Sequence, residues 1–339
     1  MSLYDKIMIN RKQGIIMKIG NVNLKDGLFL APMAGFSDRA MRIMCRRFGA
    51  EYLTTEMVSA KAICYKDKKT PLLARITEEQ NPCAVQIFGS DPTFMAHAAE
   101  EIACGAVGGI APVAIDINMG CPVPKIVNNN EGSALMKDPA RVEKIVYAVK
   151  NAVSLPVTVK IRSGWDNGSI NALEIALAAE AGGADAVFVH ARTRAQMYSG
   201  SADFSVIRRV KECVKIPVIG NGDVVDSKSA LRLKEESGCD GIMIGRGAIG
   251  RPFVFREIHC ALNGLDYTEP EICKKISIAK EQLRLAVEDK GEFSAVTEAR
   301  KQLAEYIKGI NGAARLRGRI NSATTYEEVS EILEEACTV

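Results

Sequence analysis

Residues 118–125 read NMGCPVPK and carry a cysteine on a tight turn. Cys121 lies between a glycine and a proline, directly after the mostly apolar run 114–117. A small reactive side chain that a tight turn holds at the end of a strand is where an enzyme would place a working group. The alternative is an inert turn that carries a small apolar side chain. This position makes Cys121 the first candidate for a catalytic residue.

Three further polar side chains interrupt apolar runs that have the composition of strands. Lys160 lies within TVKIRSGW, Gln86 within VQIF, and His190 at the end of VFVH. A lysine inside an apolar strand is costly unless its charge is used or paired, so Lys160 is the strongest single signal. A buried histidine or glutamine with satisfied hydrogen bonds is common, and these two become informative only beside Lys160.

Two glycine-rich turns, GNGD at 220–223 and GRGAIGR at 245–251, follow later apolar runs. Backbone N–H groups of such turns, a helix N-terminus and an arginine can together hold a phosphate group. Glycines also serve simply to make short turns. Arg246 beside the glycines favours the phosphate site.

A phosphate site combined with Lys160, Gln86 and the backbone of residues 32–34 suits flavin mononucleotide, FMN. Gln86 can hydrogen-bond the pyrimidine edge of the ring. Lys160 can place positive charge near N1 and the C2 carbonyl, where negative charge accumulates on reduction. The same residues can hold a different phosphorylated ligand, so the residues alone indicate a phosphate-bearing cofactor or substrate, with a flavin preferred.

Eight short apolar runs alternate with amphipathic stretches, which is the pattern of βα units on a parallel sheet. Their number and the roughly 250 residues that they fill predict an α/β fold, a (β/α)8 barrel. The alternative is an open doubly wound sheet, but residues 31–35 read APMAG and lack its glycine pattern. The predicted strands cover residues 28–31, 52–55, 84–88, 114–118, 157–161, 186–190, 218–220 and 241–244.

The carboxyl ends of the strands in such a barrel form one rim, where the chemistry takes place. The unusual polar and glycine residues of this sequence cluster at that end, and such joint placement is hard to obtain by accident. The residues concerned are Pro32, Met33, Ala34, Gln86, Asn118, Cys121, Lys160, His190, Asn221, Gly222, Asp223, Gly245 and Arg246.

Beyond residue 255 the strand pattern stops, and helical patterns cover residues 271–288, 295–310 and 326–336. Thr324 and Thr325 each precede a glutamate by three residues, which predicts the start of the last helix. We expect three parts: a polar N-terminal extension at 1–16, a barrel at 17–258 and a helical domain at 259–339. Residues 60–82 form a long polar connection within the barrel.

The composition is that of a soluble globular protein, with 339 residues of which 47% are hydrophobic and 25% charged. No apolar run approaches the roughly 18 residues of a membrane span, and no signal peptide is expected. The ten cysteines include no CxxC pair and no histidine at zinc-ligand spacing, so we predict no metal site and a reducing, cytoplasmic location. The net charge of +3 permits an acidic partner without indicating one.

Seven stretches together resemble the tRNA-dihydrouridine synthases, most of all their bacterial B-type subfamily. DINMGCP and GSALM are specific to that family, whereas PVIGNGD and IGRG occur more widely among flavin barrels. The resemblance runs in order from residue 18 to residue 258, and the helical tail takes the place of the family's tRNA-binding domain. The stretches are LAPMAGFSDRAMR, VQIFGSDP, DINMGCPVPKIVNNNEGSALMKDP, VTVKIRSGWD, VHARTRAQMYSG, PVIGNGDV and MIGRGAIGRPFVFREI.

This resemblance implies a flavin enzyme that uses NADPH to reduce the C5–C6 double bond of a D-loop uridine in tRNA. Reduced FMN would deliver hydride to C6, and Cys121 would donate the proton to C5. Asn118 would face the uracil, and Arg192 and Arg194 of the HARTR stretch would contact the nucleotide. The residues that would hold the flavin are Pro32, Met33, Ala34, Gln86, Lys160, His190, Asn221, Gly222, Asp223, Gly245 and Arg246. The family further suggests a monomer.

A uridine must leave the folded tRNA to reach a cofactor inside a barrel mouth. Binding should then come largely from phosphate contacts. The run RLRGR at 315–319 is the densest basic patch of the tail; its glycine predicts a turn, and the acidic stretch EEVSEILEEA should face away. The basic tail residues are Arg300, Lys301, Lys308, Arg315, Arg317 and Arg319.

Two other functions remain open. One is an FMN-barrel reductase of a free pyrimidine or another small molecule, which would need neither the DINMGCP stretch nor a basic helical tail. The other is a tRNA-binding protein without a redox role, against which the presence of both Lys160 and Cys121 speaks.

Overall fold

The computed structural model describes residues 17–68 and 70–338. Eight parallel strands follow one another around a barrel, each overlapping one predicted run, which confirms the (β/α)8 fold. The barrel closes between its first two strands, where Leu30 N–H donates to Tyr52 O at 3.0 Å. The strands are β3 (Leu28–Leu30), β4 (Leu53–Thr54), β6 (Cys83–Phe88), β7 (Ile115–Met119), β8 (Val157–Arg162), β9 (Ala186–His190), β10 (Val218–Asn221) and β11 (Gly241–Ile244).

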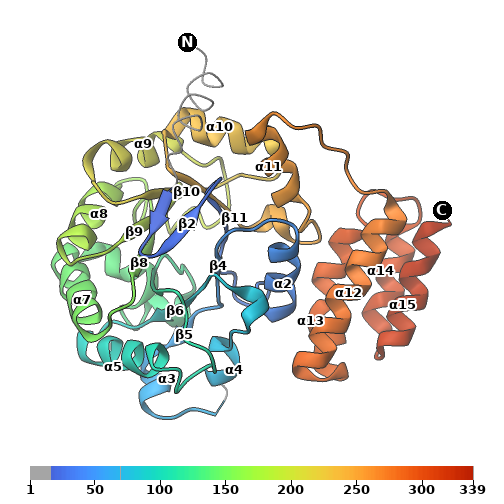
Figure 1. Cartoon of the computed structure of the whole chain (residues 1–339), viewed down its shortest axis with the longest axis horizontal. Coiled ribbons are helices and arrows are strands. Elements are labelled where there is room, and N and C mark those ends of the chain that lie inside the picture. Colours follow the sequence, from blue (N-terminus) through green and yellow to red (C-terminus); the bar gives the residue numbers. More distant parts are fainter. Residues whose placement is uncertain (1–16, 69, 339) are drawn as a thin grey trace.

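Helices cover the outside of the barrel (Figure 1), so the strands are buried on both faces and consist largely of Val, Ile and Leu. Several helices begin directly after an aspartate whose carboxylate accepts a free N–H of the first turn. The helices are α2 (Arg39–Arg47), α5 (Pro92–Ala103), α7 (Pro139–Ala152), α8 (Ala172–Ala181), α9 (Phe204–Cys213), α10 (Ser227–Ser237) and α11 (Val254–Asn263).

The polar connection at 60–82 contains short helical elements. The short strand β5 (Val58–Ser59) leads into α3 (Ala60–Cys64), α4 (Thr70–Ala74) and the 3-10 turn η1 (Glu78–Gln80). The buried Arg42 of α2 ties this connection down, because its guanidinium donates to Gln80 Oε1 at 2.7 Å and to Arg75 O at 3.0 Å.

An antiparallel hairpin precedes the barrel and does not correspond to any predicted element. It consists of β1 (Met17–Ile19) and β2 (Val22–Leu24). Its buried Ile19 and Leu24 pack against Phe29, Phe188 and other side chains at the amino-terminal ends of the strands. The hairpin therefore closes that end of the barrel (Figure 1). The predicted extension at 1–16 lies outside the described residues.

The C-terminal segment folds into four helices, one more than the three predicted stretches. They are α12 (Ile272–Lys290), α13 (Glu292–Tyr306), α14 (Ala313–Ser322) and α15 (Tyr326–Glu334). The predicted start of the last helix is confirmed: Thr325 Oγ1 accepts the N–H of Glu328, and the Glu328 carboxylate accepts the N–H of Thr325. No helix of the described residues is long and apolar enough to cross a membrane.

Two expectations about the basic run RLRGR are wrong. Gly318 lies inside α14 instead of a turn, because buried Leu316 and Ile320 hold one face of the helix while Gly318 is exposed on another. The acidic stretch does not face away, since Glu335 accepts hydrogen bonds from Arg319 at 2.5 and 2.6 Å and also approaches Arg315.

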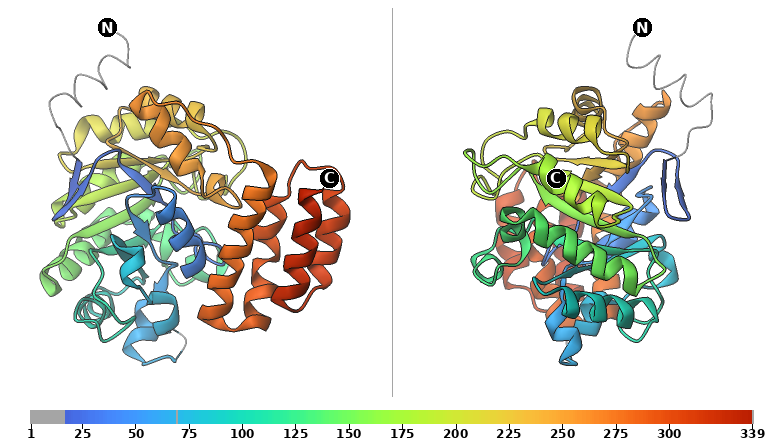
Figure 2. Two further views of the ribbon diagram at one scale, coloured as in Figure 1. Left: turned by 45° about the vertical axis from the view of Figure 1, so that its right-hand side comes forward. Right: turned by 90° about the vertical axis from the view of Figure 1, so that its left-hand side faces the viewer.

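The four helices stand beside α2 of the barrel (Figures 1 and 2). Ile43 and Met44 on α2 and Phe253 before α11 belong to the same apolar cluster as the tail helices. Two ion pairs flank this contact: Arg39 with Asp289 at 3.1 Å and Lys290 with Asp38 at 2.7 Å. The tail is therefore fixed to one side of the barrel through buried apolar side chains.

Candidate active site

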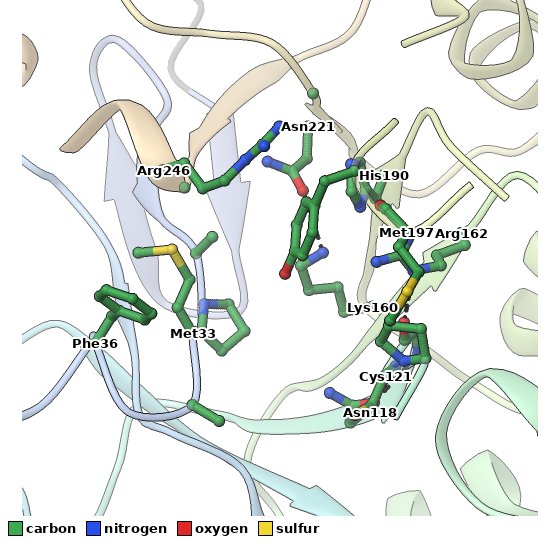
Figure 3. A pocket seen from close by; sticks show the side chains of 18 of the residues that line it. Met33, Phe36, Asn118, Cys121, Lys160, Arg162, His190, Met197, Asn221 and Arg246 are labelled. Atoms are coloured by element: carbon green, nitrogen blue, oxygen red, sulfur yellow. Dashed lines mark hydrogen bonds between the residues drawn. The ribbon is translucent and has the colours of Figure 1, made fainter. Parts of the chain in front are cut away.

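A cavity of about 620 Å³ opens at the carboxyl ends of the barrel strands. Figure 3 shows Met33 and Phe36 on one side of it, facing Cys121, Lys160 and Met197 on the other. Thirteen of the fifteen predicted site residues line this cavity: Pro32, Met33, Ala34, Gln86, Asn118, Cys121, Lys160, His190, Asn221, Gly222, Asp223, Gly245 and Arg246.

Lys160 projects from β8 into the cavity, where its Nζ donates to Asn221 Oδ1 at 3.2 Å. Among the described residues, no carboxylate lies within ion-pair distance of this ammonium group. Burial, together with the charge of Arg162, lowers the pKa of Lys160 to about 8, although Asp116 opposes the shift. Within the described residues Lys160 is therefore a cation without an ion-pair partner, and only the charge of Asp116, beyond ion-pair distance, partly balances it.

His190 ends β9 and is buried beside the same cations. Burial lowers its pKa well below the ordinary value, and Lys160, Arg162, Arg192 and Arg246 lower it further. The imidazole is consequently neutral at physiological pH and can donate or accept a hydrogen bond without adding charge.

The turn that carries Cys121 is fixed from three sides. Asn118 Oδ1 accepts the N–H of Cys121 at 2.9 Å and that of Gly120 at 3.2 Å. Ser133 Oγ donates to Cys121 O at 2.9 Å, and Arg162 Nε donates to Gly120 O at 2.7 Å. The backbone around the thiol is thus held by side chains from the rim itself.

Burial raises the pKa of the Cys121 thiol above its ordinary value, while the N–H of Val123 and the charge of Arg162 lower it. The net shift is upward, so the thiol keeps its proton at neutral pH. The Val123 N–H and Arg162 would stabilise the thiolate that remains once the proton has been given away. This environment suits a proton donor better than a nucleophile, which acts as the thiolate.

A row of hydrogen bonds links the turn to a buried carboxylate in the barrel. Asp116 on β7 accepts from Thr158 Oγ1 and from Gln86 Nε2, both at 2.6 Å. Gln86 Oε1 in turn accepts from Asn118 Nδ2 at 2.9 Å. An ionised carboxylate can only accept hydrogen bonds, so the Gln86 amide must turn its N–H group toward Asp116 and its oxygen toward Asn118. Asn118 then donates its N–H group to Gln86. Its own oxygen, Oδ1, is left to accept from the Cys121 turn.

The glycine-rich turns after β10 and β11 pack against each other at the rim. A Cβ on Gly247 would lie 2.3 Å from Val224 O, so this approach requires a glycine. Asp223 in the first turn accepts from Arg192 and from Ala202 N–H, the latter at 2.8 Å. Burial alone would raise the pKa of its carboxyl, but these bonds hold that pKa below the ordinary value. Arg246 lies 3.8 Å from Asp223, half exposed over the cavity.

Arg192 and Arg194, predicted to contact a nucleotide, do not line the cavity. The buried guanidinium of Arg192 is used within the protein, where it donates to Ser199 O at 3.1 Å and pairs with Asp223 at 2.8 Å. The guanidinium of Arg194 lies over the ring of Trp165, 4.6 Å from its centre.

Several lining residues were not predicted. Arg162 is the most important of them, since it donates to Gly120 O and lowers the pKa of Lys160. It lies two residues after Lys160 on the same strand, and the two-residue period of a strand would have placed both side chains on the inner face. Tyr198 lies under the guanidinium of Arg246, 4.5 Å from the ring centre, on a loop whose conformation no local pattern predicts.

The donor set of the cavity fits an anionic cofactor. Lys160, Arg162 and Arg246 line it, whereas Asp223 is the single lining carboxylate among the described residues and is already paired with Arg192. Backbone turns at Gly222 and Gly245 leave room beside Arg246 for a phosphate group, and the volume is in the range of small-molecule sites. The protein thus offers positive charge that a bound anion would balance.

Comparison with known proteins agrees with this geometry. A family model described as dihydrouridine synthase matches residues 29–339. The chain is 41% identical over 319 residues to the tRNA-dihydrouridine synthase B of Vibrio parahaemolyticus, covering 94% of this chain and 98% of that protein. It is 39% identical over 325 residues to a probable tRNA-dihydrouridine synthase of Rickettsia conorii, covering 95% and 97%. A solved structure of histamine dehydrogenase from Rhizobium sp. 4-9 shares the fold, with a TM-score of 0.56 and 14% identity over 80% of this chain and 50% of that one.

Proposed function

The chain belongs to the dihydrouridine synthase family, and we propose that it reduces the C5–C6 double bond of a D-loop uridine in tRNA to 5,6-dihydrouridine. The observation that carries the proposal is the shared cavity of an unpaired cation, Lys160, and a protonated thiol, Cys121. Reduction of a polarised carbon–carbon double bond needs a hydride donor near one carbon and an acid near the other. Lys160 would help to hold the flavin that supplies the hydride, and Cys121 would be the acid.

The cofactor in this proposal is FMN, with NADPH as the reductant. When bound and reduced, the flavin supplies the hydride for C6 of the uracil. Lys160 would place positive charge beside the pyrimidine edge of the ring, while Gln86 and His190 would contribute hydrogen bonds. The glycine turns and Arg246 would hold the phosphate group, and the backbone of Pro32, Met33 and Ala34 would form one wall.

Cys121 Sγ would donate its proton to C5 of the uracil. A carbon atom is a poor base, so proton transfer to it needs a positioned acid. Although burial raises the pKa of Cys121, a thiol is a far stronger acid than a serine hydroxyl. The Val123 N–H and Arg162 would stabilise the thiolate until solvent returns the proton. Asn118 would act on the reaction by holding the Cys121 turn, and it also borders the space where a uracil would lie.

The helical segment, for which we propose the bounds 259–339, would bind tRNA beside the barrel. Lys301 on α13 supports this role: its ammonium lies 4.1 Å from the centre of the Phe36 ring, which itself lines the cavity. The basic run at 315–319 is a weaker candidate, because Arg315 and Arg319 are paired with Glu335.

The experiment that tests the function is mass spectrometry of an unmodified tRNA transcript after incubation with the protein, FMN and NADPH. A gain of two hydrogens on one uridine is the expected result, and the fragment that carries it names the position. A protein that binds flavin and oxidises NADPH but leaves the transcript unchanged would contradict the proposal and favour a small-molecule substrate.

A further inference from the structure

Three segments of the rim bring two cations onto one aromatic ring. Lys137 Nζ lies 3.3 Å from the centre of the Trp165 ring, and the Arg194 guanidinium lies 4.6 Å from it. Lys137 ends the 3-10 turn η2 (Gly132–Lys137), Trp165 follows β8, and Arg194 follows β9. None of the three lines the cavity, and the proposed reaction uses none of them.

The cluster is built rather than accidental. Arg194 N–H donates to Gly164 O and Ala195 N–H to Trp165 O, both at 2.9 Å, so the two loops are tied together. Asn171 Nδ2 donates to Met136 O at 2.7 Å, which fixes η2 to the loop after β8. The cations therefore keep their places over the ring because the backbone of each segment is held.

Both cations lack an anionic partner. Within residues 17–68 and 70–338, no carboxylate lies at ion-pair distance from Lys137 or Arg194, and Arg194 Nε is buried without a hydrogen bond. The neighbouring acids are engaged locally: Asp138 accepts the N–H of Arg141 at 3.0 Å, and Asp166 accepts that of Gly168 at 3.0 Å. The cluster thus presents two positive charges that nothing in the described chain neutralises.

The cluster lies at the mouth of the cavity, where an RNA strand with one base inserted would pass. β8 lies four places from β3 in the order of the eight barrel strands, so Trp165 and the Phe36–Lys301 contact stand on opposite sides of the mouth. A polynucleotide with one base inserted into the cavity must continue outward on both sides, and its backbone would meet positive charge at each.

We propose that Lys137, Trp165 and Arg194 bind a backbone phosphate of the tRNA strand next to the inserted uridine. The inference rests on the proposed function. A phosphate fits better than a stacked base, because the indole ring already carries both cations. Arginine and lysine are the usual partners of RNA phosphates.

Trp165 is the only tryptophan of the chain, so its fluorescence reports on this site directly. We expect titration of the flavin-loaded protein with unmodified tRNA transcript to change the emission saturably. Lys137→Ala combined with Arg194→Ala should weaken tRNA binding about tenfold at 0.15 M salt and reduce the slope of log K against log salt by about one. Lys144→Ala on the outer helix α7 is the matched control and should bind as the wild type does.

Wild-type affinity and slope in the double variant, or tRNA binding without any change in Trp165 emission, would overturn this inference. If the double variant does not fold, Lys137→Glu alone is decisive, because Lys137 is exposed. Failure of the proposed function is distinct: the wild-type protein, loaded with flavin and supplied with NADPH, would then leave the transcript unreduced, whether or not it binds it.

Discussion

At the scale of single residues, burial moves the two reactive side chains of the cavity toward their neutral forms. It raises the pKa of Cys121, which keeps the thiol protonated, and lowers the pKa of Lys160 to about 8, which brings its deprotonation near neutral pH. The first shift prepares an acid. The second makes Lys160 sensitive to any anion that binds beside it.

Cys121→Ala should reduce the rate of uridine reduction about a hundredfold to ten-thousandfold, the usual contribution of a positioned general acid. Binding of tRNA and flavin should stay at the wild-type level, because Asn118 and Ser133 hold the turn through the backbone of Cys121, which the substitution leaves in place. Single-turnover oxidation of the reduced enzyme by tRNA measures the rate. An unchanged rate in this variant would remove Cys121 from the mechanism.

The pH dependence of flavin binding should follow Lys160. Its amine is charged below about pH 8 and neutral above, so an anionic cofactor should bind more tightly at pH 7 than at pH 9.5, with protons taken up on binding in between. The affinity should fall by up to about tenfold for each pH unit above 8. Quenching of flavin fluorescence measures it. Lys160→Met should bind more weakly at pH 7 and lose this dependence; an identical slope in the variant would contradict the assignment.

At the scale of elements, three adjacent strands share one row of hydrogen bonds whose direction is set by the Asp116 carboxylate. Exchanging the carboxylate and the amide at positions 116 and 118 tests whether Asp116 sets the direction of these hydrogen bonds. Asn118→Asp puts two acceptors face to face, and Asp116→Asn turns Gln86 and Asn118 around, so that an N–H group faces the Cys121 turn. Each change alone should cost about 1–3 kcal/mol of unfolding free energy and slow the reaction.

The double variant Asp116→Asn/Asn118→Asp should recover most of that loss. The new amide at position 116 would accept from Thr158 and donate to Gln86, which would then donate to the new carboxylate at position 118. That carboxylate would accept from the turn as Asn118 does. Denaturant unfolding of single and double variants measures the recovery. Additive losses would show that the direction of the row does not matter.

The barrel strands could be predicted, although β3 and β4 are as short as the hairpin strands, because each apolar run belongs to a repeated alternation with amphipathic helical stretches. The hairpin β1–β2 could not, since three residues per strand carry no period, and its formation depends on the apolar side chains at the open end of the barrel. Helix α14 was missed at Gly318 because tertiary packing of Leu316 and Ile320 overrides the preference of glycine for turns.

The site could be predicted as a set of residues but not as a set of bonds. Lys160 and Cys121 were recognisable by type and position, and Arg162 could have been added from the alternation of β8. The burial of Arg192 against Asp223 depends on how the turns after the neighbouring strands β9 and β10 fold against each other. No local pattern contains that information.

At the scale of the whole molecule, the barrel and the tail share side chains of α2 in one apolar cluster. We therefore expect the described chain to unfold as a single unit. Met44→Ala, which empties space at this contact, should lower the unfolding free energy by about 2–5 kcal/mol. In the wild type and in the variant alike, the loss of helix measured by circular dichroism and the release of flavin should have the same unfolding midpoint. Separate midpoints would mean that the tail folds independently.

The hairpin at the amino-terminal end leaves the described barrel with a single mouth. In the proposed reaction NADPH and the tRNA strand would both enter through this mouth, so we expect each to depart before the other arrives. Ping-pong kinetics follow from that exclusion: double-reciprocal plots should give parallel lines, and a large excess of either substrate should inhibit. Intersecting lines would require a second way in. Because the hairpin closes the amino-terminal end of the barrel, we expect the two substrates to bind in turn at the carboxyl-terminal mouth.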